Sequence, residues 1–420
     1  MVNGKWSIEM KANLKSRCFS QINFRMKKYI SLIIGIVLAT GVHNLFAQNN
    51  FLSPGTKVYK VAVFAPMYLD SVFDNTDISA GNSIPKFIMP AVEFVQGAQI
   101  AFDTLLLNGK RAEAFIFDSK GFRRPISWLI KNGILDSMDL IIGSVKEPDY
   151  QELANFSLEK KIPFISATYP NDGGITDNPD LLIVNSTLKA HCEGIFSYLL
   201  QKHGTDKIYL IKKKGDDRIE NYFKEINNID GKPILNIRTI ALDSSISSWS
   251  LLRRIDTLSS TVIIGASLNE TFSKKLADAC YPIQKKHPLI LFGMPNWDGF
   301  KSFAKKDAYT DFPILYTTPH YDAGDTSFNN ILVQKYFKLY RAKPSDMAYK
   351  GFEMAYYFLN ILLHHPDNFM DNINDSNYSV FHDFHFMPVF TSKNKTAPDY
   401  YENKHLFIMH ILNGELARVW

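Results

Sequence analysis

The sequence predicts an α/β protein with two lobes, each a doubly wound, mostly parallel sheet. Two observations lead to this prediction. Short β-branched runs alternate with helical patterns, and the strand-like runs are apolar on both faces, as in parallel strands buried between helices. The alternation also passes through two successive series, and 420 residues at about 150 per domain suit two domains.

The first series of elements starts at residue 57. Residues 92–107 form a helix, because apolar side chains recur at spacings of four, three and four from Phe94 to Leu105. A second helix covers about 150–160. The strands predicted in this series are 58–64, 114–117, 140–142, 163–165 and 181–184.

The second series starts with a helix over 190–203. A new run of apolar strands after a completed first series indicates a second sheet. The strands predicted in it are 207–211, 234–240, 261–264, 289–292 and 314–316.

The end of the chain departs from this alternation. A long helix covers 345–364, preceded by Pro344 and capped by Ser345. Strand-like residues follow around 384–386 and 405–411. Asn413-Gly414 is a strong signal for a hairpin turn, so we expect the α/β body to end in a C-terminal β-hairpin.

The first 47 residues read as an export signal. Met26 is the expected true start, since it opens a basic stretch followed by an apolar run over 29–42, with Ala47 at the end. The run is shorter than the ~20 residues that span a bilayer, although an uncleaved anchor is the alternative. No Cys follows the run, so we expect a periplasmic protein without a lipid anchor.

The basic charge belongs to this segment. Residues 1–47 hold seven Lys or Arg and one Glu, so the net +5 of the chain becomes −1 for residues 48–420. Nucleic-acid binding needs a basic patch and is not expected. Cys192 and Cys280 remain in the mature chain. They are either two buried thiols or, in an oxidising compartment, a disulfide.

Motifs that carry catalysis are missing from the sequence. It contains no Gly-rich phosphate loop, no His-Glu-x-x-His and no Cys-x-x-Cys. Residues 265–269 approach a hydrolase nucleophile elbow, but Asn269 stands where the elbow needs Gly. The acidic pair 216–217 could serve as paired carboxylates, but it follows three lysines and is expected to be a solvated charge cluster. The histidine pair 364–365 makes a poor chelate, because adjacent helical residues point about 100° apart. We therefore expect no enzyme, no metal and no cofactor.

The positions after the strands favour a small-molecule site. Ligands of open parallel sheets bind beyond the carboxyl ends of the strands, and small, hydroxyl and aromatic residues gather at these ends. The candidate ligand-binding residues are Met67, Tyr68, Ser144, Thr168, Tyr169, Lys213, Ser267, Met294, Asn296 and Tyr321.

Sequence segments in this order resemble the type I periplasmic binding proteins, the leucine/isoleucine/valine receptor family of ABC importers. The segments are VAVFAPMY, FVQGAQIAFDTL, DLIIGSV, NFSLEKKIPFISATYP, HGTDKIYLI, TVIIGAS, PLILFGMPNW and PSDMAYKGFEMAYYF. The resemblance covers roughly residues 58–420, and APMYLDSVFD with FVQGAQIAFDTL is most similar to a Bacteroidetes-type branch.

The resemblance implies two discontinuous lobes joined by three crossings, with the solute bound in the cleft between them. By analogy, residues 57–186 and 321–372 form the N-terminal lobe. Residues 187–320 and 373–420 form the C-terminal lobe.

The resemblance also implies roles for single residues. Thr168 matches the position that receives a ligand carboxylate in amino-acid binders, and Met67 and Tyr68 match the ligand-contacting loop. The family's usual spacing places Lys146 or Glu147, rather than Ser144, at its serine position. The family's acidic partner for an ammonium group falls near Pro295 or Asn296, neither of which is acidic. A standard α-amino acid is therefore disfavoured.

Two further features bear on the ligand. Tyr68, Tyr169, Trp297 and Tyr321 either line a cleft or, for Trp297 above all, pack in the core. The long connection over 70–90 is either a lid or a decoration of the cleft.

The function expected from the resemblance is solute capture for ABC-type import or sensing, without catalysis. The partners expected are a small solute and an ABC permease or envelope protein, and the mature chain is not expected to span the membrane. The alternative is a degenerate binding fold that acts as a protein-interaction scaffold or regulator in the cell envelope.

Overall fold

The computed structural model describes residues 57–74, 77–78, 84–107, 111–243, 245–320, 327–392 and 395–420. The predicted signal 1–47 and the candidate Tyr321 lie outside these residues, as does part of the connection over 70–90. The described chain forms two compact units. Unit 1 takes its residues from Met1–Tyr169, Ile175–Leu182 and Gly324–Phe381, and unit 2 from Pro170–Gly174, Ile183–Ala323 and His382–Trp420.

The first seven-stranded sheet has the order β15-β16-β7-β6-β5-β1-β4. Strand β1 pairs in parallel with both β4 and β5, β5 pairs in parallel with β6, and β15 and β16 are antiparallel. The strands are β1 (Tyr59–Ala65), β4 (Ala112–Asp118), β5 (Leu140–Gly143), β6 (Phe164–Ser166), β7 (Leu181–Ile183), β15 (Phe386–Val389) and β16 (Tyr400–Asn403).

The second seven-stranded sheet has the order β11-β8-β12-β13-β14-β17-β18. Its first five strands are parallel, and β17 and β18 are antiparallel additions. The strands are β8 (Lys207–Lys213), β11 (Ile237–Leu242), β12 (Thr261–Ala266), β13 (Leu289–Phe292), β14 (Ile314–Thr318), β17 (Phe407–Leu412) and β18 (Glu415–Arg418). Asn413 and Gly414 join the last two strands with φ of 52° and 75°, the backbone of a type I′ turn. The predicted C-terminal hairpin is confirmed.

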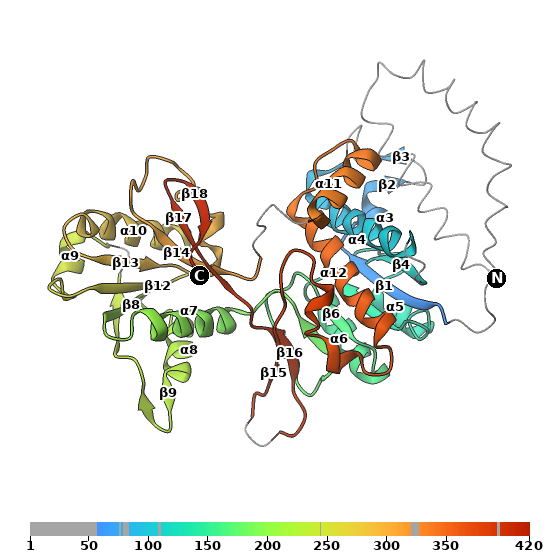
Figure 1. Cartoon of the computed structure of the whole chain (residues 1–420), viewed down its shortest axis with the longest axis horizontal. Helices are drawn as coiled ribbons and strands as arrows, with labels where there is room; N and C mark the ends of the chain where they lie inside the picture. Colours follow the sequence, from blue (N-terminus) through green and yellow to red (C-terminus); the bar gives the residue numbers. More distant parts are fainter. Residues whose placement is uncertain are drawn as a thin grey trace, which may run out of the picture. The chain divides into compact units, whose positions relative to one another are not determined.

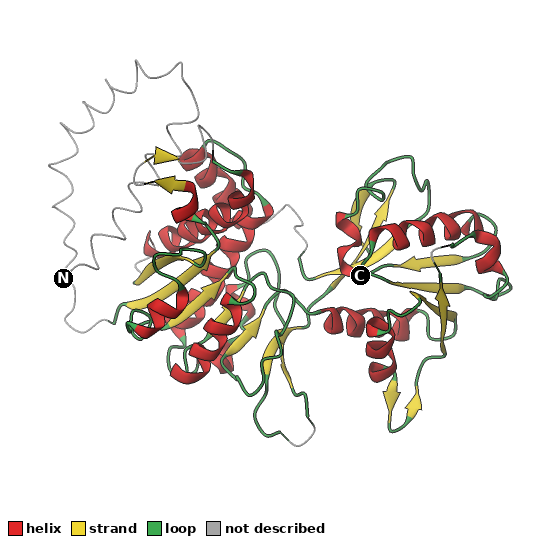
Figure 2. Cartoon of the chain, turned by 180° about the vertical axis from the view of Figure 1, so that it is seen from behind, coloured by secondary structure: helices red, strands yellow, loops and turns green. Residues whose placement is uncertain are grey.

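Helices lie on both sides of the strands in each unit (Figure 2), as a doubly wound fold requires. The helices are α3 (Leu69–Val72), α4 (Met89–Leu107), α5 (Ile126–Lys131), α6 (Asp149–Lys160), α7 (Leu188–Lys202), α8 (Arg218–Ile226), α9 (Ser248–Leu252), α10 (Glu270–Gln284), α11 (Ser327–Tyr340) and α12 (Asp346–His364). Short 3₁₀ helices are η1 (Lys86–Ile88), η2 (Pro295–Gly299), η3 (Phe369–Asn372) and η4 (Ser376–Tyr378). Two small hairpins pair β2 (Phe73–Asp74) with β3 (Asp77–Ile78) and β9 (Asn228–Ile229) with β10 (Lys232–Pro233).

The long helix α12 lies against α4 in unit 1 (Figure 1). Ser345 caps it, as predicted, by accepting a hydrogen bond from the Ala348 amide. Glycines let the two helices approach closely. A Cβ at Gly97 would lie 1.9 Å from the Ala348 carbonyl oxygen, and one at Gly351 would lie 1.9 Å from that of Phe94. Both positions therefore exclude any side chain.

The predicted α/β class and its two mostly parallel sheets are confirmed. Cys192 in α7 and Cys280 in α10 are both buried and free, so the disulfide alternative is wrong. Burial raises the pKa of both thiols, which makes them inert packing groups. In the part of the chain that the structure describes, no helix combines the length and apolar character that crossing a membrane takes.

Candidate functional site

The carboxyl ends of four neighbouring parallel strands in unit 1 meet along one edge of the first sheet. The strands are β6, β5, β1 and β4 in sheet order. We call the residues that follow their ends the unit 1 edge: Met67, Tyr68, Ser119, Lys120, Ser144, Thr168 and Tyr169. All of these residues follow the ends of parallel strands, at the edge where such sheets bind ligands.

Ser144 and Thr168 lie side by side at this edge. Gly143 pairs with Ser166 in the β5–β6 ladder, and the Ala167 amide donates to the Gly143 carbonyl oxygen, which fixes the register just beyond the strands. The side-chain oxygens of Ser144 and Thr168 are 3.2 Å apart, so one hydroxyl donates to the other. The structure thus brings these two sequence candidates together.

Two further hydroxyls at the ends of these strands are deeply buried. Ser119 follows β4 with 5% exposure, and Ser166 ends β6 with 0%. Neither Oγ makes a hydrogen bond to any residue that the structure describes. A buried polar atom without a partner is uncommon in a folded protein. These groups are therefore positions where an added molecule would gain hydrogen bonds.

Asp118 organises the loop after β1. Its carboxylate accepts hydrogen bonds from the amides of Met67, Tyr68 and Leu69 at 2.9, 3.1 and 2.6 Å, and from that of Lys120 at 3.0 Å. Tyr68 takes a left-handed backbone with φ of 52° to make this turn. Burial raises the pKa of the Asp118 carboxyl above its ordinary value, against the lowering effect of the four amides.

The two candidates in that loop have different surroundings. The Met67 side chain is buried, with 1% exposure, so it belongs to the core. The half-buried Tyr68 ring packs edge-on against Phe87 with centroids 5.4 Å apart. The sequence reasoning missed Asp118, although an acidic residue closing an apolar strand is a usable signal.

An ion pair lies at the same edge. Lys120, after β4, contacts Asp149, the first residue of α6, with Nζ 3.0 Å from Oδ1 and 2.9 Å from Oδ2. The Asp149 side chain is 12% exposed and that of Lys120 is 24% exposed. Nearby, the half-buried Tyr169 donates its hydroxyl to exposed Glu147 at 3.0 Å. Neither Lys120 nor Asp149 was a sequence candidate, because 29 residues separate them.

The carboxyl edge of the second sheet is covered by Trp297. This side chain is fully buried and donates its indole N–H to the Ser267 carbonyl oxygen at 2.9 Å. It lies over two glycines, since a Cβ at Gly265 or Gly293 would come within 2.5 or 2.2 Å of its ring. Met294, with 0% exposure, is buried in the same core. Trp297 is thus a core residue, one of the two alternatives that the sequence left open.

The remaining candidates of unit 2 make local contacts. Asn296 donates to the Leu268 carbonyl oxygen at 2.9 Å. Ser267, only 1% exposed, accepts from the Asn269 amide, and Asn269 in turn caps α10. Residues 265–269 are therefore a helix entry. Lys213 is exposed at the end of β8.

Neighbouring charges at the end of β8 form a closed network. Lys212 makes ion pairs with both Asp217 and Glu220, and Glu220 also pairs with Lys224 at 2.7 Å. Asp217, the second residue of the acidic pair 216–217, thus belongs to an ion-pair cluster. The carboxylates of Asp217 and Glu220 already have cationic partners.

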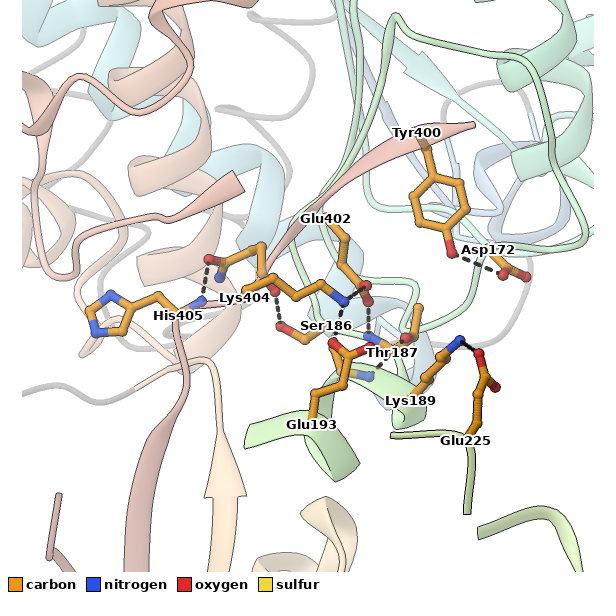
Figure 3. Close-up of polar contacts among 12 residues, drawn as sticks. Asp172, Ser186, Thr187, Lys189, Glu193, Glu225, Tyr400, Glu402, Lys404 and His405 are labelled. Atoms are coloured by element: carbon orange, nitrogen blue, oxygen red, sulfur yellow. Dashed lines mark hydrogen bonds and ion pairs between the residues drawn. The ribbon is translucent and has the colours of Figure 1, made fainter. Parts of the chain in front are cut away.

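A second polar cluster surrounds the start of α7 in unit 2 (Figure 3). The buried Glu402 accepts from the Thr187 amide at 2.7 Å, and Lys404 bridges Glu402 and Glu193 at 2.6 and 2.7 Å. Ser186 donates to the Asn403 carbonyl oxygen at 2.6 Å. These charges satisfy one another and cap the helix, so this cluster has a structural role.

Two histidines of unit 2 lie close together. The rings of His320 and His382 lie 5.6 Å apart in an edge-on arrangement. In unit 1, His364 contacts the Asn360 carbonyl oxygen of its own helix at 2.8 Å.

Comparison with known proteins identifies the fold. No protein-family model matches the chain, and no curated protein sequence matches it either. Solved structures do match. A putative branched-chain amino acid ABC transporter from Rhodospirillum rubrum superposes with a TM-score of 0.61 at 11% identity, over 86% of this chain and 100% of that one. The chain has the type I periplasmic binding protein fold.

Other solved structures of this fold give the same picture. A branched-chain amino acid ABC transporter periplasmic ligand-binding protein from Burkholderia xenovorans has a TM-score of 0.56 at 12% identity, over 86% of this chain and 94% of its own. An ABC transporter substrate-binding protein from Desulfitobacterium hafniense in complex with Leu has a TM-score of 0.52 at 12% identity, over 86% and 100%. The predicted recognition is confirmed at the level of the fold, and the Bacteroidetes-type branch stays a prediction.

Proposed function

We propose that the mature chain is a non-catalytic, extracytoplasmic protein that binds a small solute at the unit 1 edge, for ABC-type import or sensing. One observation carries the proposal: hydroxyl groups and an ion pair gather at the carboxyl ends of four parallel strands, and two of the buried hydroxyls have no hydrogen-bond partner among the described residues. Open parallel sheets bind ligands at this place. Two of the solved structures of the same fold that we compared are named as a ligand-binding and a substrate-binding protein, and the third as an ABC transporter.

Catalysis is not supported by the residues at the two edges. Ser267, in the sequence that approaches a nucleophile elbow, is buried and occupied in a helix entry. A nucleophile needs a base within hydrogen-bond reach, whereas Ser144 has a hydroxyl, that of Thr168, as its neighbour. Binding without chemistry is the simpler role for these side chains.

The proposed location is the periplasm. It rests on the basic start at Met26, the apolar run over 29–42 and the small residue Ala47. Sequencing the N-terminus of the protein recovered from the periplasm of a bacterial host tests this, and we expect it to begin at Gln48. An intact N-terminus in the membrane fraction would indicate an anchor instead.

Thermal unfolding of the exported protein against a metabolite library tests the function. A solute at a hundred times its Kd adds ~2.7 kcal/mol of stability, which raises Tm by about 2–4 °C for a domain of 150–250 residues. The library contains amino acids, short peptides, amides, purines, sugars and cell-wall fragments. A clear rise with one chemical class supports solute binding, and no rise with folded, ligand-free protein contradicts it.

The burial of Trp297 over the second sheet favours a second candidate, a scaffold in the cell envelope whose binding site is silent. In that case the edge of unit 2 contributes packing rather than ligand contacts. A scaffold is expected to capture an envelope protein irrespective of solute. A solute receptor is expected to show solute-dependent stability.

A further inference from the structure

We propose that the solute is a neutral, hydroxyl-rich molecule, a sugar or polyol, and that the Lys120–Asp149 ion pair binds one of its hydroxyl groups. This inference rests on the proposed function and names the class of solute. It comes from the geometry of the pair, from the charge balance of the unit 1 edge and from the kind of polar atoms that are left there.

The pair bridges the carboxyl end of β1. Lys120 follows β4, Asp149 follows β5, and β1 lies between these strands in the sheet. The Lys120 ammonium donates to Asp149 Oδ1 at 3.0 Å. Oδ2 is buried and lies 2.9 Å from the same nitrogen, but it receives a hydrogen bond from none of the residues that the structure describes. One carboxylate oxygen therefore remains able to accept.

This arrangement suits a hydroxyl group. An ammonium group has three donors, and a carboxylate oxygen is an acceptor only. An alcohol both donates and accepts, so a single hydroxyl can donate to Asp149 Oδ2 while it accepts from Lys120. The hydroxyl then contacts both the cation and the anion of the pair. A hydrogen bond to a charged group is stronger than one between neutral groups.

The charge balance of the edge favours a neutral solute. Two carboxylates at this edge already have partners: the half-buried Asp118 accepts from four backbone amides, and the buried Asp149 faces Lys120. The other charges in the loop after β5, Lys146 and Glu147, are exposed and opposite in sign. A charged solute group buried here would meet no uncompensated buried counter-charge, which makes its burial unfavourable.

The other polar atoms are hydroxyls as well. Ser119 precedes Lys120 directly and has a buried Oγ without a partner among the described residues. Ser144 and Thr168 add two more hydroxyl oxygens on the far side of β1. Each can donate or accept, which matches a solute with several hydroxyl groups.

The ion pair at the end of β8 shows what a purely structural network looks like. There Glu220 uses both oxygens, one toward Lys212 and one toward Lys224. Asp149, by contrast, has a single cationic partner and one oxygen without a donor among the described residues. This difference indicates that Lys120 and Asp149 form a binding site, rather than only holding two loops together.

The first experiment compares matched rings that differ only in charge. Thermal unfolding of the exported protein is measured with glucose, glucuronate and glucosamine, with galactose, galacturonate and galactosamine, and with mannitol and myo-inositol. We expect at least one neutral compound to raise Tm, and to do so more than its acid or amine. A preference for a charged ring, or no shift with any of these compounds, overturns the inference.

The second experiment assigns the pair by calorimetric titration of the neutral compound that binds. Lys120→Gln and Asp149→Asn are each expected to weaken its binding by about 10- to 100-fold, since each removes a hydrogen bond to a charged group. The double variant K120Q/D149N leaves no unpaired buried charge, so binding can be measured even if a single variant fails to fold. It is expected to bind no better than the weaker single variant.

The control pair is Lys160 and Asp136, 3.3 Å apart at the other end of α6. Lys160→Gln is expected to leave the titration unchanged. If Asp149→Asn strengthens binding while Lys120→Gln abolishes it, the site takes an anion, and the reverse pattern indicates a cation; either result overturns the inference. Binding of another library class with no neutral sugar or polyol refutes only this inference. If no compound of the whole library raises Tm, the proposed function is refuted as well.

Discussion

The carboxyl edges of the two parallel sheets start from similar strand ends and differ in what covers them. At the second sheet, Trp297 lies over Gly265 and Gly293 and closes the edge with a core aromatic. At the first sheet, Ser144 and Thr168 follow the strand ends, with further hydroxyls at the neighbouring strands. The same strand chemistry thus yields a packed edge in one unit and a polar edge in the other. Solute contacts are therefore to be sought first in unit 1.

The largest effect is expected from Trp297→Ala. Removing a fully buried indole leaves a cavity over the two glycines and removes the shorter of the two hydrogen bonds that the Ser267 carbonyl oxygen accepts. We expect a loss of about 3–5 kcal/mol in the free energy of unfolding. Urea unfolding followed by circular dichroism measures it.

A second tryptophan in unit 2 provides the matched control. Trp249 is 67% exposed, and the Arg253 guanidinium lies 4.7 Å from its ring. Trp249→Ala is expected to change stability by less than about 0.5 kcal/mol. If Trp297→Ala were as mild as the control, the aromatic would not be closing this edge.

A smaller effect, dependent on pH, is expected from His191 at the same edge of unit 2. Its Nδ1 lies 2.8 Å from the Oγ1 of Thr317, near the carboxyl end of β14. Burial, together with the Lys404 cation, lowers the pKa of His191 to about 3. Because the unfolded chain takes up a proton at a higher pH than the folded one, the stability that this group contributes is complete above about pH 6.5. It is lost progressively as pH falls toward 3, by about 1.4 kcal/mol per pH unit.

The variant His191→Gln tests this sign. Between pH 6.5 and 4, its free energy of unfolding is expected to depend less steeply on pH than that of the unmodified protein. The difference in slope corresponds to the uptake of up to one proton fewer on unfolding. Urea titrations at several pH values measure the slope. Equal slopes would mean that His191 is not held neutral in the folded chain.

The fold was predictable because its strands are apolar on both faces and its turns carry local signals. The strands near 140–142 and 261–264 are fully buried, and Asn413-Gly414 makes the predicted turn. The contact between α4 and α12 was not predictable. A glycine within a helical pattern, such as Gly97, does not say which backbone approaches it.

The candidate site was predictable only in part. The rule that ligands bind beyond strand ends found Ser144 and Thr168, which the structure brings within 3.2 Å. It also selected Met294, which is buried. Whether a residue at a strand end is accessible to a ligand depends on which side chains pack over that end, and the local sequence does not show this. Lys120 and Asp149 escaped notice, since their contact depends on the order of the strands in the sheet rather than on spacing along the chain.

Small effects on stability, and the sharpest contrast between the edges, are expected from two serines. Ser144→Ala removes a hydroxyl whose partner is the half-buried Thr168, so stability should change by no more than about 1 kcal/mol. Solute binding should weaken by about 10-fold if that hydroxyl bonds the solute. Ser267→Ala removes a buried hydroxyl that accepts from the Asn269 amide, so it should cost stability and leave binding unchanged. Titration and urea unfolding on both variants compare the edges directly, and equal binding losses would show that both edges contact the solute.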